Sequence, residues 1–305
     1  YEANFGEIPF GDIKDFTGDK VSDSDLEKMI PDHDVLTGGF PCQAFSIAGK
    51  RGGFEDTRGT LFFDVARILK VKRPKAFILE NVKGLVSHKR GKTLNTILNV
   101  LRNELNYYVP DPKVLNAKDF GVPQNRERIL IVGFRQDLGI ESFTYPKTNI
   151  ENSKFSTGQI FAQIKEENEV SVRYYLSDTY LKTLKEHKAR HTRKGNGFGY
   201  EIIEDNESAN AIVVGGMGRE RNLVLDDRLT NFEPVTNIKG DVNREDVRRM
   251  TPREWARLQG FTDEYIIDVV SDTQNYKQFG NSVAIPVIQA VGNEVLNTVK
   301  INYVR

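Results

Sequence analysis

Residues 76–81 read Ala-Phe-Ile-Leu-Glu-Asn, a short apolar run that ends in a carboxylate and an amide. Such a run, opened by a proline and closed by polar residues, is typical of a buried parallel strand. Upstream, residues 33–37 (HDVLT) predict a second strand, which ends in a pair of glycines. Residues 60–69, between the two strands, place apolar side chains at helical spacing. Because strand, helix and strand in this order form a crossover unit, we expect a parallel sheet covered by helices.

The alternation of helices and strands continues to residue 135. Residues 92–105 carry an apolar stripe at helical spacing, and residues 113–116 and 129–134 read as two further strands. This pattern predicts an α/β fold of the Rossmann-like type for the first part of the chain.

The chain becomes polar and irregular after Pro146, with only short β-like runs such as those at 211–214 and 223–225. From residue 248 the helical pattern returns. Thr251 and Pro252 predict a capped helix to Leu258, and Ser282 predicts the cap of a helix from 283 to about 299. We therefore expect a catalytic domain at 1–147, a smaller irregular domain at 148–247 and a segment at 248–305 that returns to the first domain.

Composition excludes several classes of protein. The chain has 305 residues, and 43 Lys and Arg balance 43 Asp and Glu. No apolar run approaches the roughly 20 residues of a membrane helix, and no signal peptide opens the chain. The single cysteine, Cys42, cannot form an internal disulfide, which predicts a reducing compartment such as the cytoplasm.

Cys42 lies in the stretch Gly-Gly-Phe-Pro-Cys-Gln, directly after the first predicted strand. In open α/β sheets, ligands bind at the carboxyl ends of the strands, so the thiol is expected at a ligand crevice. A lone cysteine is more often a small buried hydrophobe. Its position in a glycine-proline loop rather than in an apolar stripe favours a nucleophile.

Glu80 follows the second predicted strand and is expected at the same edge of the sheet as Cys42. A carboxyl group there can act as a proton donor or a hydrogen-bond partner, although a solvated glutamate is the commoner case. Gln124, Arg126 and Arg128 share one face of an extended segment. Two guanidinium groups on one face suit a carbonyl oxygen or a phosphate, and a charged strand start is the alternative.

Seven motifs then follow one another along the chain: FGDI at 10–13, GFPCQAFS at 39–46, RGTLFF at 58–63, ENVK at 80–83, QNRER at 124–128, RMTPRE at 249–254 and QFGNSV at 278–283. In this order they closely resemble the DNA (cytosine-5)-methyltransferases of bacterial restriction–modification systems. By itself the last motif would be read as a turn leading into a helix N-terminus, where an ordinary cap is the simpler explanation.

The resemblance implies a role for each catalytic candidate. Cys42 would attack C6 of a cytosine flipped out of the DNA duplex, which makes C5 nucleophilic enough to take a methyl group. Glu80 would bind N3 and the exocyclic amine, and Arg128 would bind O2 with assistance from Arg126.

The resemblance also implies S-adenosyl-L-methionine as the methyl donor, bound by Asp12, Pro41, Leu61, Asn281 and Ser282. The family's first strand and Gly-rich loop are not found in this sequence, since the glycines at 215–218 lack the G-x-G-x-x-G spacing. The chain starts at Tyr1 and its first methionine is Met29. A truncated sequence, a split enzyme completed by a second polypeptide and a degenerate remnant all remain open, and the absent initiator methionine favours truncation.

The irregular domain occupies the place of the family's target-recognition domain. Its basic stretch at 182–200 can follow phosphates, and Arg219 and Arg221 are candidates for guanine contacts. Solvated surface residues are an equally good reading of each of these positions. His187 and His191 lack partners at metal-ligand spacing, so we assign no metal. The expected DNA-binding residues are Gln43, Ser46, Arg193, Lys194, Arg219 and Arg221.

The leading interpretation is therefore a sequence-specific DNA cytosine-5 methyltransferase, with double-stranded DNA as its partner. A cognate restriction endonuclease is a functional partner that the resemblance suggests. Two alternatives are the DNA-binding subunit of a split methyltransferase and an RNA cytosine-5 methyltransferase. The sizeable region between residues 128 and 249 favours an enzyme that reads a DNA duplex.

Overall fold

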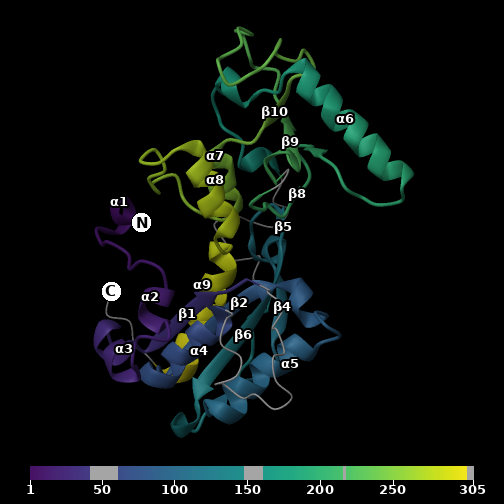
Figure 1. Cartoon of the computed structure of the whole chain (residues 1–305). Helices are drawn as coiled ribbons and strands as arrows, with labels where there is room; N and C mark the ends of the chain where they lie inside the picture. The colour runs from purple at the N-terminus through teal and green to yellow at the C-terminus, as the bar shows by residue number, and fades with distance from the viewer. Residues whose placement is uncertain (42–60, 148–160, 216–217, 301–305) are drawn as a thin grey trace. The chain divides into compact units, whose positions relative to one another are not determined.

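The computed structural model describes residues 1–41, 61–147, 161–215 and 218–300, and these residues belong to two compact units. Unit 1 consists of residues 1–115, 127–147 and 289–305, and unit 2 consists of residues 116–126 and 148–288. Figure 1 shows the elements of both units. Residues 248–288, which the sequence assigned to the segment returning to the first domain, fall within unit 2.

Unit 1 is built on one mixed sheet whose strand order is β1-β2-β6-β3, with β4 also paired to β6. Its strands are β1 (Val35–Gly39), β2 (Ala76–Val82), β3 (Tyr107–Tyr108), β4 (Lys113–Asn116) and β6 (Glu127–Arg135). The expected parallel pairing of β1 with β2 is confirmed. The expectation of an all-parallel sheet is wrong, because β6 runs antiparallel to both β2 and β3. The chain between β3 and β6 contains β4, β5 and a short 3-10 turn but no α-helix, and without a crossover helix the returning strand runs in the opposite direction.

The described helices of unit 1 are α1 (Glu2–Phe5), α2 (Lys14–Thr17), α3 (Asp23–Met29), α4 (Leu61–Lys72) and α5 (Lys92–Asn99), which continues as a π-helix at Val100–Glu104. Two of these helices, α4 and α5, bury apolar residues in one cluster with the strands of this sheet, whereas α1 has no buried residue. Phe62 and Leu69 of α4 share one buried cluster with Phe77 of β2 and Ile131 of β6. Gly133 faces Phe77 across the β2–β6 pair, and a Cβ atom there would lie 2.2 Å from the phenyl ring.

The described residues of unit 2 form two small sheets and the helices α6, α7 and α8, and the last helix, α9 (Ile285–Val299), begins in this unit and ends in unit 1. One sheet has the order β10-β9-β7, and the other pairs β5 with β8. The strands are β5 (Gln124–Asn125), β7 (Glu201–Ile203), β8 (Ala209–Asn210), β9 (Asn222–Leu225) and β10 (Val247–Arg249), and the helices are α6 (Asp178–Arg193), α7 (Pro252–Leu258) and α8 (Asp272–Asn281). Short 3-10 turns occur in both units: those of unit 1 lie at Lys83–Val86 and Gln136–Leu138, and those of unit 2 lie at Ala117–Phe120, Phe161–Gln163, Val172–Tyr174 and Gly218–Glu220.

Three expectations about unit 2 can be compared with these elements. The helix capped by Thr251 is confirmed, and Glu254 completes its capping box. The expected β-like run at 211–214 is wrong, because strand pairing there ends at Asn210. The expected cap of the last helix is also wrong, since Ser282 terminates α8 and donates from Oγ to the Phe279 carbonyl. The sequence at 278–283 predicts a turn, whereas α8 continues to Asn281.

A buried ion network connects β9, β10 and α7 in unit 2. The Arg248 side chain is fully buried, donates to Asp226 over 2.8 Å and binds both oxygens of Glu254 at 2.8 Å. Burial alone would raise the pKa of Asp226, but hydrogen bonds from Arg228 and Arg248 hold it well below its usual value. Each charged side chain of this network has an oppositely charged partner, so we assign the network to the stability of unit 2 and not to ligand binding.

Among the described residues, none of the helices is both long enough and apolar enough to span a bilayer.

Candidate active site

The pairing of β1 with β2 brings Gly39 and Glu80 side by side at the ends of the two strands. A Cβ atom at Gly39 would lie 3.4 Å from Glu80 Oε2, so the carboxylate reaches across the end of β1. The chain continues from Gly39 through Phe40 and Pro41 to Cys42. Cys42, Gln43 and Ser46 lie outside the described residues, and their predicted roles stay predictions.

Asn81 fixes the start of the segment that leads to Cys42. Its side chain is buried, its Nδ2 donates to the Phe40 carbonyl over 2.7 Å, and its Oδ1 accepts from the Val82 backbone over 2.8 Å. Sequence reasoning quoted this residue within ENVK but gave it no role. The available signal was its position directly after the buried strand, where an amide can hold the neighbouring chain.

Glu80 and Arg128 form an ion pair from adjacent strands of unit 1. Arg128 Nε lies 2.8 Å from Glu80 Oε1, and each side chain is 17% exposed. The antiparallel register that pairs Val82 with Arg128 brings the two side chains together. Burial lowers the pKa of Arg128, and the attraction of Glu80 opposes that shift. The pair combines an oxygen acceptor with guanidinium donors, which can bind the polar edge of a planar base.

Arg126 contacts backbone carbonyls within unit 2. Its side chain is buried, and its guanidinium donates to the carbonyls of Ile212 and Ser282, each over 2.8 Å, and of Gly280 over 3.2 Å. Gln124 is buried as well, whereas Asn125 between them is exposed, as the expected alternation requires. Arg126 belongs to unit 2 and Arg128 to unit 1, since the chain passes between the units at this point.

The candidate cofactor residues are divided between the units. In unit 1, Asp12 and Pro41 are exposed, and Leu61 opens α4 half-buried against the main core. Asp12 Oδ1 accepts from the Lys14 backbone over 2.9 Å. In unit 2, Asn281 is the exposed last residue of α8, and Ser282 is half-buried behind it.

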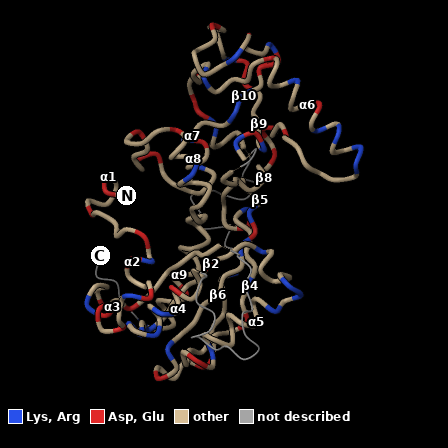
Figure 2. The backbone as a smooth tube through the Cα atoms, in the orientation of Figure 1, with Lys and Arg blue, Asp and Glu red and all other residues tan. Residues whose placement is uncertain are grey.

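The candidate DNA-binding residues in the described part of unit 2 are exposed. Arg193 ends α6 and Lys194 caps it, and Figure 2 shows that basic residues recur along this helix. Arg219 lies in the Gly218–Glu220 turn with its guanidinium 5.6 Å from the Tyr276 ring centre, and Arg221 follows it. In the part of the chain that the structure describes, His, Cys, Asp and Glu side chains form no group of three or more that could hold a metal.

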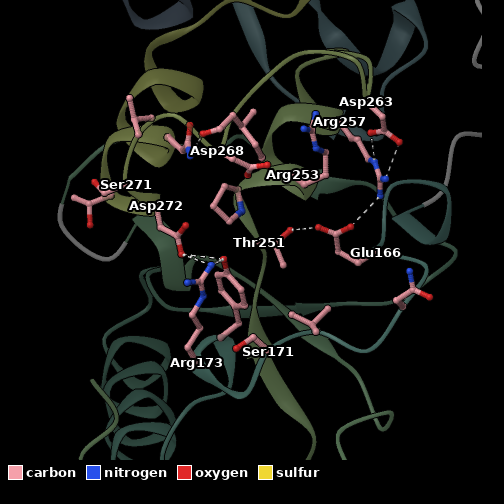
Figure 3. Close-up of a pocket in the computed structure, with 18 of the residues that line it drawn as sticks. Glu166, Ser171, Arg173, Thr251, Arg253, Arg257, Asp263, Asp268, Ser271 and Asp272 are labelled. Atoms are coloured by element: carbon pink, nitrogen blue, oxygen red, sulfur yellow. Dashed lines mark hydrogen bonds and ion pairs between the residues drawn. The ribbon is translucent and has the colours of Figure 1, made fainter. Parts of the chain in front are cut away.

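A separate pocket of about 940 Å³ lies in unit 2 (Figure 3). Its charged groups bind one another: Arg257 pairs with Asp263 at 2.8 Å, Arg173 lies 3.4 Å from Asp272, and Thr251 donates to Glu166 over 2.8 Å. None of the catalytic candidates is among the described residues that line it.

Comparison with known proteins agrees with this geometry. Residues 1–297 match the family described as C-5 cytosine-specific DNA methylase. The type II methyltransferase M.HpaII of Haemophilus parainfluenzae is 63% identical over 297 residues, which cover 97% of this chain and 79% of that protein. M1.ScrFI of Lactococcus lactis subsp. cremoris, also a type II methyltransferase, is 44% identical over 302 residues, which cover 98% and 69%.

The crystal structure of the S. pombe Dnmt2 methyltransferase has the same fold. It matches with a TM-score of 0.67 at 16% identity, over 99% of this chain and 87% of that one. The expected Rossmann-like methyltransferase fold is therefore confirmed. The family methylates C5 of cytosine in DNA and uses S-adenosylmethionine as its methyl donor. On the match over residues 1–297 and the 63% identity, this chain belongs to the C-5 cytosine-specific DNA methylase family, in its bacterial restriction–modification type.

Proposed function

We propose that this chain methylates a flipped cytosine within a specific double-stranded DNA sequence, with Cys42 as the covalent nucleophile. The observation that carries the proposal is the Glu80–Arg128 ion pair, which lies beside the end of the strand leading to Cys42. Both side chains are held in place by the sheet and are partly shielded from water. They therefore need little reorganisation to bind a pyrimidine ring.

Cys42 makes C5 reactive by adding to the ring. The thiolate forms a bond to C6, and the C5–C6 electron pair becomes available at C5. S-adenosylmethionine, when bound, supplies a methyl group on a positively charged sulfur. After C5 has taken the methyl group, loss of the C5 proton to a base re-forms the double bond and expels the Cys42 thiolate.

Glu80 and Arg128 stabilise the charge that moves into the ring during this addition. Glu80 shares a proton with N3 and accepts from the exocyclic amine, and the Arg128 guanidinium donates to O2. The 2.8 Å contact between them supports this assignment, because it orients both groups before the base enters. Arg126 assists by holding the backbone carbonyls of Ile212 and Ser282 in place.

The proposed cofactor residues offer chemistry that suits S-adenosylmethionine. The Asp12 carboxylate can accept from the adenine amine, and Leu61 and Pro41 provide apolar surface for the adenine ring. Asn281 and Ser282 provide an amide and a hydroxyl for the amino-acid end of the molecule. This set of groups fits the cofactor without a metal ion.

Residues 148–247 act as the target-recognition domain in this proposal, with residues 1–147 and 248–305 as the catalytic part. Arg193 and Lys194 bind phosphates, Arg219 and Arg221 read bases, and Gln43 and Ser46 contact DNA beside the nucleophile. The exposure of the four described residues supports this role. A cognate restriction endonuclease is the functional partner, since both proteins would act on the same DNA site.

A trapping experiment tests the mechanism. The chain is incubated with S-adenosylmethionine and duplex DNA that contains 5-fluorocytosine, whose C5 fluorine cannot leave as a proton does. We expect a covalent protein–DNA adduct on a denaturing gel, and it maps to one residue because the chain has one cysteine. Cys42→Ser, the matched control, should give no adduct. Methyl transfer to the exocyclic amine, or C5 transfer without an adduct, would contradict the proposal.

A further inference from the structure

One segment of unit 2 packs directly onto the last turn of α8. We call residues 212–215 and 218–221 the glycine-arginine segment; residues 216 and 217 lie outside the described residues. A Cβ atom at Gly280 would lie 2.5 Å from the Val214 side chain and 3.2 Å from its backbone nitrogen. Only a glycine therefore allows this close approach. Arg219, in the same segment, places its guanidinium over Tyr276, one helical turn before Gly280.

Glycines also fix the shape of the segment itself. Gly215 has a φ of +90°, and its carbonyl accepts from the Gly218 backbone over 3.1 Å. A Cβ atom at Gly218 would lie 2.1 Å from the Val213 carbonyl oxygen. The described parts of the segment thus have one tight conformation that larger residues would disrupt.

Two buried side chains connect the start of this segment to α7 and to the end of α8. Arg126 donates to the Ile212 carbonyl and also to the carbonyls of Gly280 and Ser282. Gln124 accepts from the Ile212 backbone over 3.1 Å and donates to the Leu258 carbonyl over 2.7 Å. Both backbone groups of Ile212 are therefore held by side chains from one short stretch of chain.

A shift of the segment must then displace the turn at residues 280–282. The segment and the turn are connected by buried hydrogen bonds and by the close contact between Gly280 and Val214. Closely packed elements of this kind move between discrete arrangements rather than deform gradually. The segment carries Arg219 and Arg221, and the turn contains Asn281 and Ser282. Two proposed ligand-binding regions thus share one packed element.

We infer that Arg126 is a positioning residue that couples DNA binding at Arg219 and Arg221 to cofactor binding at Asn281 and Ser282. The inference rests on the proposed function of those four residues. Each ligand stabilises the arrangement that the other one binds, so the two bind with positive cooperativity. Because such coupling is reciprocal, cofactor must tighten DNA binding by the same factor as DNA tightens cofactor binding.

Calorimetry on the full chain tests the coupling with S-adenosylhomocysteine as the cofactor probe. Its Kd is measured alone and with a duplex that carries a methylation site mapped by bisulfite sequencing. We expect the Kd to fall by about fivefold or more when the duplex is present, which is the lower end of typical coupling. Arg126→Lys and Val214→Ala should both bring this ratio close to one.

Matched controls separate coupling from general damage. Arg253 also holds two loop carbonyls in unit 2, those of Thr262 and Tyr265, so Arg253→Lys should keep the wild-type ratio. Val269 is an exposed valine outside the segment, so Val269→Ala should keep it as well. Val214 is 43% exposed, and its replacement tests the contact in a chain that should fold normally.

The outcomes distinguish the coupling from the function on which it rests. A wild-type chain that methylates DNA and binds both ligands independently would overturn the coupling and leave the function intact. A folded Arg126→Lys or Val214→Ala variant with the wild-type ratio would overturn it too. A wild-type chain that binds neither ligand would overturn the proposed function and the coupling together.

Discussion

Asn81 donates a hydrogen bond from Nδ2 to the backbone carbonyl of Phe40 over 2.7 Å, and so joins the end of β2 to the chain that leads into Cys42. Both residues are buried, at 2% and 7% exposure, so water does not compete for this bond. The segment that leads to the proposed nucleophile therefore begins from a fixed point beside Glu80. This relationship and the ones described below lead to testable predictions.

Asn81→Ala should lower kcat by about 10- to 100-fold, because a small misplacement of a nucleophile has an effect of this size. DNA affinity should change much less, since the buried Asn81 side chain is not available to bind DNA. Single-turnover methylation and a separate DNA-binding assay measure the two effects. Asn103→Ala removes an exposed amide from the same unit and is the control. An unchanged kcat would mean that the bond does not position Cys42.

Cys42→Ser should abolish turnover and leave DNA binding intact, because a serine hydroxyl is scarcely ionised at neutral pH. Tritium transfer from labelled S-adenosylmethionine measures turnover, and a gel-shift assay measures binding. Methylation retained at even about one-tenth of the wild-type rate would remove Cys42 from the mechanism.

Glu80→Gln should slow the chemical step by about 100-fold and weaken DNA binding far less, because the carboxylate acts mainly on charge that develops in the ring. Arg128→Lys should also be slow, since an ammonium cannot reproduce the guanidinium contact with Glu80. The double variant tests the pair: its loss in kcat should be smaller than the product of the two single losses. Multiplicative losses would show that the two residues act independently.

Arg248→Met should lower the free energy of unfolding by about 3–5 kcal/mol, because it leaves the buried carboxylates of Asp226 and Glu254 without this partner. Denaturant unfolding monitored by Trp255 measures the change. Arg102→Met removes an ion pair whose partner, Asp111, is 99% exposed, and it should have little effect. Similar losses in the two variants would contradict a special role for the buried network.

The same network predicts how the wild-type chain responds to acid. The pKa of Asp226 is depressed in the folded state, so its contribution to stability is complete above its unfolded value of 3.8. That contribution is lost as the pH falls below this value toward the lower folded pKa. Urea unfolding across this pH range should show a decline in stability that is smaller in Asp226→Asn than in the wild type.

Gly133→Ala should destabilise unit 1 by about 1–3 kcal/mol, because the new methyl group would lie 2.2 Å from the Phe77 ring. Phe77→Leu in the same chain should recover part of the loss by making room. Thermal unfolding of the two single variants and the double variant measures this. Strictly additive losses would mean that the ring does not limit the site.

The local elements of the fold could be predicted from the sequence because their signals are local. Periodic apolar residues identified α4 and β2, and Thr251 with Pro252 identified the start of α7. The direction of β6 could not be predicted, since hydrophobic periodicity is the same for a strand that runs either way. Helix α8 was missed because Gly280, Asn281 and Ser282 at its end are residue types that favour turns and caps.

Part of the candidate active site could also be predicted from the sequence. The position of Glu80 next to the strand that leads to Cys42 followed from the order of the strands. The pairing of Glu80 with Arg128 depends on the antiparallel register of β2 and β6, which no short stretch of sequence contains. The contacts of Arg126 depend on carbonyls at positions 212, 280 and 282, so they too required the folded chain.

Residues 116–126 belong to unit 2 although they lie in the sequence within unit 1, ahead of β6. A chimaera that takes only residues 148–288 from a relative would therefore bring a foreign Ile212 and a foreign α8 against the native Gln124 and Arg126. We expect such a chimaera to keep its unit 2 intact only where both parents have these two side chains. The short stretch ahead of β6 thus limits which pieces of two relatives can be interchanged.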